Sequence, residues 1–119
     1  MEELIKFETA RKAKDKKFDI LCEHDSGIQE NNQNGFRDWN KEYKNSYSRP
    51  TQSVLAKWLR ENHNIDVFLD SVGGRSGYYY VLQYVDSGNQ IKTGDTYHIF
   101  EEAYEKGLFE ALNLLEDVN

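Results

Sequence analysis

The sequence predicts an α+β fold in which two helices lie on one face of a three-stranded antiparallel sheet, in the order α-β-β-β-α. Residues 50–63 and the stretch from Phe100 to Leu115 place apolar side chains at helical spacing. Between them, three strand-like segments are separated by short turns, which is typical of an antiparallel meander. The simplest way to bury both apolar helix faces is to lay them on the same side of the sheet.

The chain has the length of one domain. We divide its 119 residues into the α-β-β-β-α unit over 50–116 and an N-terminal extension over 1–48. Mean hydropathy is −0.86, but an aromatic content of 13% is too high for a disordered chain. We therefore expect a single folded domain, 1–119, with polar loops.

The N-terminal extension contains a predicted short helix, a candidate strand and a long connection. Residues 6–17 are rich in helix formers, and Phe18 after them is expected to anchor in the core. Apolar and polar side chains alternate in part over 19–28, as in a strand. Residues 29–48 combine turn-forming Asn and Gly with spaced aromatics, which indicates a connection either packed by those aromatics or mobile.

The central helix is predicted over 50–63. Pro50 suits its first turn, where a missing N–H costs nothing, and Asn64 fits the position just past its end. One apolar face is formed by Val54, Leu55, Trp58 and Leu59.

Three strands are predicted over 65–72, 78–86 and 90–99, with turns at 73–77 and 87–89. The middle strand gives the strongest signal because it is nearly all aromatic or β-branched.

The last helix keeps its apolar spacing without a break. Gly107 lies on the apolar face at a cost of about 1 kcal/mol relative to Ala, so we expect close packing against the sheet to compensate. Glu101 and Glu102 in the first turn suit the helix dipole.

The charge and the cysteine content argue against several classes of protein. A net charge of −6 disfavours a general nucleic-acid binder, because phosphate contacts need Lys and Arg. Residues 1–18 hold six basic and four acidic side chains, whereas residues 95–119 hold seven acidic and one basic. The single cysteine, Cys22, excludes an intrachain disulfide, and no apolar run is long enough for a membrane helix or a signal peptide. We therefore expect a cytoplasmic protein.

No catalytic, cofactor or metal site can be assembled from the sequence. Cys22 and His24 would share a strand face, but a Cys–His nucleophile or a metal site needs further partners that the spacing does not supply. We interpret them as a buried thiol and a surface histidine. We expect no enzymatic activity and no cofactor, with an enzyme using Cys22 as the last alternative.

The segments FETARKAKDKKFD, PTQSVLAKWLRENHNI, YYYV and EEAYEKGLFEALNLL span most of the chain. Together they resemble a set of small uncharacterised proteins from Bacteroides-type bacteria and their phages and prophages. The matching residues are Glu8, Thr9, Ala10, Ala13, Lys14, Phe18, Pro50, Thr51, Gln52, Leu55, Trp58, Leu59, Arg60, Glu61, His63, Glu101, Glu102, Ala103, Glu105, Gly107, Leu108, Glu110, Ala111 and Leu112. The resemblance implies phage or mobile-element biology and no known activity.

Two positions depart from this pattern. Lys17 replaces the glycine that follows the first helix, so we expect that helix to end differently. His98 and Ile99 replace an Asp-Thr cap before the last helix, which removes the better capping side chain.

The order of elements is also similar to that of a double-stranded-RNA-binding domain. That module places lysines at the start of its second helix on phosphates, and it reaches minor grooves with its first helix and first strand loop. Here the corresponding loop, 73–77, holds only one cation, Arg75, and Glu101 and Glu102 stand where the lysines are expected. A nucleic acid is therefore the disfavoured partner.

The middle strand presents two apolar faces, and the helices can cover only one. Tyr78, Tyr80, Leu82 and Tyr84 share one face, whereas Tyr79, Val81, Gln83 and Val85 share the other. Either the N-terminal segment covers the second face or a partner does. Stacking of nucleic-acid bases on Tyr is a further alternative that the acidic charge disfavours.

The central helix leaves Lys57, Arg60 and His63 outside its apolar stripe, either as a solvated face or as contacts to a partner. The candidate partner-binding residues are therefore Tyr79, Val81, Gln83, Lys57, Arg60 and Arg75. We expect a non-enzymatic, phage- or prophage-type protein that binds a host or phage protein. The alternative is a nucleic-acid-binding module. The oligomeric state stays open, including a dimer through the sheet face.

Overall fold

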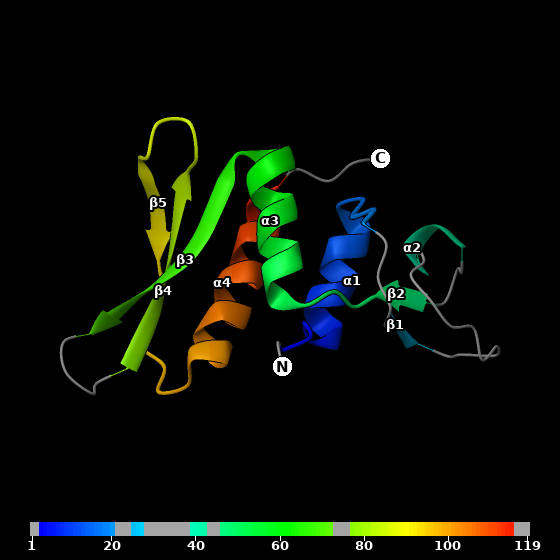
Figure 1. Cartoon of the computed structure of the whole chain (residues 1–119), viewed down its shortest axis with the longest axis horizontal. Coiled ribbons are helices and arrows are strands. Elements are labelled where there is room, and N and C mark those ends of the chain that lie inside the picture. Colours follow the sequence, from blue (N-terminus) through cyan, green and yellow to red (C-terminus); the bar gives the residue numbers. More distant parts are fainter. Residues whose placement is uncertain (1–2, 21–24, 28–38, 43–45, 73–76, 116–119) are drawn as a thin grey trace.

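The computed structural model describes residues 3–20, 25–27, 39–42, 46–72 and 77–115. The molecule is elongated, 47 × 30 × 18 Å, and its layers follow one another along the long axis (Figure 1). A three-stranded sheet lies at one end, two long helices come next, and a third helix packs on their far side. The helices are α1 (Phe7–Asp15), α2 (Trp39–Glu42), α3 (Gln52–His63) and α4 (Phe100–Leu114).

The main sheet is antiparallel with the strand order β3-β4-β5. Its strands are β3 (Ile65–Val72), β4 (Gly77–Tyr84) and β5 (Gln90–Thr93). Helices α3 and α4 pack on the same face, and this confirms the predicted α+β fold and its α-β-β-β-α order (Figure 1). A second small sheet pairs β1 (Asp25–Gly27) with β2 (Ser46–Ser48) at the other end of the molecule.

The observed strands differ most from the predicted ones at the third strand. β3 has the predicted bounds, and β4 begins one residue earlier and ends two residues sooner than predicted. The third strand was predicted to reach residue 99, but β5 ends at Thr93, and only Tyr97 pairs again, with Tyr78. Gly94 still donates its N–H to the Tyr80 carbonyl at 3.1 Å, and its backbone lies against the Tyr80 ring, where a Cβ atom would overlap the ring carbons.

The central helix starts two residues later than predicted. Thr51 is its N-cap, and the Thr51 hydroxyl accepts a hydrogen bond from the Val54 N–H at 3.4 Å. Pro50 lies before the helix, and its carbonyl accepts from the Ile5 N–H at 3.0 Å. The far end is as predicted, because Asn64 adopts the left-handed conformation with φ 60°.

The expectation that the first helix ends differently without a glycine was wrong. Lys17 adopts a left-handed conformation with φ 68°. The Phe18 N–H donates to the Ala13 carbonyl and the Lys17 N–H to the Lys14 carbonyl, both at 3.0 Å. These two bonds form a Schellman motif, so a lysine occupies the position that glycine usually takes.

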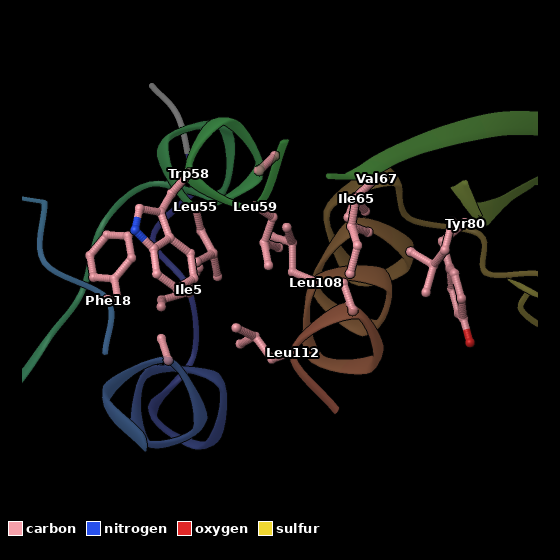
Figure 2. Close-up of a cluster of buried hydrophobic side chains, with 14 of the residues drawn as sticks. Ile5, Phe18, Leu55, Trp58, Leu59, Ile65, Val67, Tyr80, Leu108 and Leu112 are labelled. Atoms are coloured by element: carbon pink, nitrogen blue, oxygen red, sulfur yellow. The ribbon is translucent and has the colours of Figure 1, made fainter. Parts of the chain in front are cut away.

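The core runs through all three long helices to the sheet (Figure 2). Leu55, Leu59, Leu108 and Leu112 are fully buried at its centre. At one end Phe18 packs edge-on against Trp58 with ring centroids 5.2 Å apart, which confirms Phe18 as an anchor.

The sheet end of the core requires Gly107. A Cβ atom on Gly107 would lie 2.7 Å from the Cβ atom of Tyr80, so the predicted close packing of this glycine against the sheet is confirmed.

Part of the N-terminal extension lies outside the described residues. Of the strand predicted over 19–28, residues 25–27 form β1, whereas 21–24 and 28 are outside the described ranges. Of the connection predicted over 29–48, residues 39–42 form α2 and 46–48 form β2, with 29–38 and 43–45 outside.

Candidate functional site

The outer face of the sheet is the side of β3, β4 and β5 that points away from α3 and α4. Ile65, Val67, Tyr80 and Leu82 point toward the helices and are at most 4% exposed. Because side chains alternate along a strand, their neighbours occupy the other side. The outer face consists of Asp66, Phe68, Asp70, Val72, Tyr79, Val81, Gln83 and Thr93.

The strand register arranges these side chains in rows. Phe68, Val81 and Thr93 lie opposite one another across the three strands. Asp70 lies opposite Tyr79 on one side of this row. Asp66 lies opposite Gln83 on the other. The outer face therefore has an apolar centre with carboxylates along β3.

The described part of the N-terminal extension does not cover this face. Helix α1 packs against α4 and β2, on the side of the helices that is remote from the sheet (Figure 1). Of the two alternatives for the second face of β4, cover by residues 3–20 is therefore excluded.

Val81 is the best covered residue of the outer face, with only 6% exposed. Phe68 and Thr93 flank it across the sheet, and Tyr79 and Gln83 flank it along its own strand. Val81 therefore adds little exposed surface to the outer face. A partner would meet Phe68 and the half-buried Tyr79 and Gln83 first, and sequence reasoning missed Phe68 because it considered only the middle strand.

Asp70 organises one end of the outer face. Its Oδ2 atom accepts a hydrogen bond from the Tyr79 hydroxyl at 3.3 Å, and its Oδ1 atom accepts from the Ser71 N–H at 2.9 Å. The Asp70 charge, with a further contribution from burial, raises the pKa of Tyr79 above its ordinary value. The raised pKa favours the protonated Tyr79 hydroxyl, which donates the hydrogen bond to Asp70.

The cations predicted as partner contacts are placed differently. Arg60 is an exposed residue of α3, and its guanidinium lies 4.0 Å from the Asp66 carboxylate. Arg60 therefore lies at the β3 edge of the outer face. Lys57 is also exposed, one turn earlier on α3. Arg75 lies outside the described residues, as do Cys22 and His24.

A buried polar network joins three helices, and sequence reasoning did not identify it. The Glu105 carboxylate of α4 is 7% exposed and accepts hydrogen bonds from the Lys6 N–H at 2.9 Å and from the Thr9 hydroxyl. Its other oxygen accepts from the Gln52 side chain at 3.1 Å. The carboxylate thereby satisfies a donor at the N-terminus of α1, where a negative charge is favourable.

A cavity of about 350 Å³ lies between α1 and α4, beside this network. Its lining includes Lys6, Glu102, Glu105, Tyr97 and Phe109. Both Glu105 oxygens are already occupied by donors from the chain. The buried carboxylate therefore links α4 to α1 and α3.

A second polar cluster fastens β5 to α4. Lys92 Nζ donates to Glu110 Oε1 at 3.2 Å, and the Asn113 amide donates to Glu110 Oε2 at 2.9 Å. The Asn113 bond and then the Lys92 bond lower the Glu110 pKa, while the Glu110 bond raises the Lys92 pKa. Burial raises the pKa of Tyr80 beside them. Each of these pKa shifts favours the protonation state that the group ordinarily has near neutral pH, which is typical of a structural contact.

Residues 3–20, 25–27, 39–42, 46–72 and 77–115 contain no group of three or more His, Cys, Asp or Glu arranged to hold a metal ion. No helix in the same part of the chain has the length and apolar character needed to cross a membrane.

Comparisons of the chain with family models, with curated protein sequences and with solved structures each return no match. The functional inference therefore depends on the geometry of the chain itself.

Proposed function

We propose that this protein is a small non-enzymatic binding protein that docks a partner protein on the outer face of its sheet. The observation that carries the proposal is the pair Phe68 and Tyr79, which lie diagonally across β3 and β4 on a face that no described helix covers. Aromatic side chains supply large contact areas at low entropic cost, and they are enriched where proteins bind one another.

The charge of the outer face supports a partner with basic groups. Asp66 and Asp70 flank Phe68 along β3, and the whole chain carries a net charge of −6. A partner surface with Lys or Arg around an apolar centre is complementary to this arrangement. The sequence resemblance supports a phage- or prophage-type protein, with a host or phage protein as the partner.

The alternative is a nucleic-acid-binding module, and the α-β-β-β-α order is what favours it. The first turn of α4, where that module carries lysines, instead exposes Glu101 and Glu102. Carboxylates at this position repel phosphate, so a protein is the better partner.

Site-specific photo-crosslinking in a lysate of the source organism tests the proposal. A benzophenone amino acid replaces Phe68 or Tyr79 in separate samples, and it replaces Tyr84, an exposed tyrosine near the end of β4, in the control. We expect one protein to crosslink from positions 68 and 79 but not from 84, and to be lost in an Asp70→Lys background. Equal crosslinking from all three positions, or crosslinking abolished by nuclease, would contradict the proposal.

A further inference from the structure

The two edges of the sheet are built differently. β5 has only four residues, carries Lys92, and pairs with β4 through an irregular register at Leu82 and Gln83. Short strands, lysines and bulges are the features by which edge strands resist pairing with other chains. β3 lies at the other edge, has eight residues, contains neither lysine nor proline, and pairs with β4 in regular register along its whole length.

The register also fixes which backbone groups of β3 point outward. The Asn64 carbonyl accepts from the Val85 N–H at 3.1 Å, so even-numbered residues of this segment exchange hydrogen bonds with β4. Odd-numbered residues therefore direct their N–H and C=O groups away from β4. The Ser71 N–H agrees with this assignment, because it donates to the Asp70 side chain and not to β4. Val67 and Leu69 thus carry the outward backbone groups in the middle of the edge.

We propose that the partner contributes an extended segment that pairs with β3 as a fourth strand; this inference rests on the proposed function. The added strand would widen the outer face, and main-chain hydrogen bonds to Val67 and Leu69 would fix its register. Its side chains on the outer face would lie opposite Asp66, Phe68 and Asp70. Opposite charges and aromatic pairs are the favourable cross-strand neighbours. The Arg60 guanidinium already lies 4.0 Å from Asp66, so the segment recognised carries an apolar residue opposite Phe68 and a basic residue opposite Asp70.

A second copy of this chain fits the edge less well. Each copy carries a net charge of −6, which opposes self-association. In a two-fold antiparallel pairing centred on Phe68, Asp66 of one copy would face Asp70 of the other. Like charges directly opposite one another destabilise a sheet, whereas a basic residue of another segment opposite Asp70 is favourable.

Selection from random decapeptides displayed on phage particles tests the inference. Peptides are selected on the full chain and counter-selected on Leu69→Pro, which removes one of the two outward N–H groups that the added strand would use and no hydrogen bond to β4. We expect enriched peptides with basic and apolar residues at alternate positions. Alternate backbone nitrogens of such a peptide can be methylated in two ways, starting from an odd or from an even position. Methylation of the set that faces β3 should abolish binding, and methylation of the other set should leave binding intact.

Amide hydrogen exchange locates the bound peptide. In the free chain the Phe68 and Asp70 amides should exchange slowly and the Val67 and Leu69 amides faster. Binding should slow Val67 and Leu69 by at least tenfold. Peptides that leave the Val67 and Leu69 amides unchanged, or peptides that bind Leu69→Pro as well as they bind the full chain, would overturn strand addition. Protection that rises with protein concentration alone would assign the edge to a second copy. The crosslinking result at positions 68 and 79 is independent, so docking on the face can stand if strand addition fails.

Discussion

At the residue scale, the left-handed backbone conformation of Lys17 at the end of α1 lowers the stability of the folded chain. Lys17 has φ 68°, a conformation that costs a residue with a Cβ atom roughly 1–2 kcal/mol. Lys17→Gly should therefore raise the free energy of unfolding by about 1 kcal/mol, after the entropic penalty of glycine is subtracted. Urea denaturation measures the change. Lys17→Ala is the matched control, because it removes the charge but keeps the Cβ atom, and an equal gain from alanine would refute this explanation.

His63 gives a second prediction at this scale. Its ring packs edge-on against Trp58 with centroids 4.6 Å apart, and burial lowers its pKa below 6.5. The unfolded chain therefore takes up a proton at His63 before the folded chain does, so stability is lost as the pH falls below about 6.5. Above about pH 7.5 His63 is neutral in both states and contributes no pH dependence.

The test compares urea denaturation at pH 7.5 and pH 5.5. We expect His63→Gln to lose less stability than the wild type between these two conditions. His98→Gln alters an exposed histidine elsewhere in the chain and serves as the control. If both variants lose as much stability as the wild type, burial of His63 has no energetic consequence.

At the element scale, Gly107 sets the distance between α4 and the sheet. In an isolated helix alanine would be about 1 kcal/mol better than glycine. Here the new Cβ atom would lie 2.7 Å from Tyr80 Cβ and 3.1 Å from Val67 Cγ1. The strand backbone carries the Tyr80 Cβ atom, so α4 would have to move away from the sheet. Overpacking of this kind costs about 1–3 kcal/mol, and we expect Gly107→Ala to be destabilised by that amount.

Thermal unfolding followed by circular dichroism measures the effect of Gly107→Ala. Lys106→Gly at the neighbouring exposed position isolates helix propensity and should cost about 1 kcal/mol. A stabilised Gly107→Ala protein would show that α4 and β4 are not in close contact in solution.

The elements that the sequence predicts well are those whose periodicity is local. α4 repeats its apolar residues over fifteen positions, and β3 places Ile65, Val67 and Leu69 on one face between Asn64 and a glycine-rich turn, so both of its ends were predicted. The end of β5 was missed because it depends on pairing with β4, which stops after Gly94 and resumes only at Tyr97 among the described residues. The alternation in β4 predicted two faces, but only the position of α1 shows that residues 3–20 leave the outer face open.

At the scale of the whole molecule, Glu105 connects parts of the chain that no sequence pattern connects. Its donors Lys6, Thr9 and Gln52 are 99, 96 and 53 residues away. Lys16 adds a contact between α1 and α4 at the other end of α1, where its ammonium group donates a hydrogen bond to the Leu115 carbonyl at 2.8 Å. Helix α1 is thus held at both ends by α4, and the layer remote from the sheet depends on these contacts.

Glu105→Gln should therefore destabilise the whole molecule. The amide must present an NH₂ group to one of the groups that donate hydrogen bonds to the carboxylate, which leaves a buried N–H without an acceptor and costs about 1–3 kcal/mol.

Thr9→Val removes one of those donors, so the double variant should lose at least about 0.5 kcal/mol less than the two single losses combined. Glu102→Gln alters an exposed carboxylate one turn earlier on α4 and should change stability by less than about 0.5 kcal/mol. Urea denaturation of the four variants and the wild type measures the coupling. Strictly additive losses would mean that Thr9 and Glu105 do not share a hydrogen bond in solution, and α1 would then depend on its apolar contacts alone.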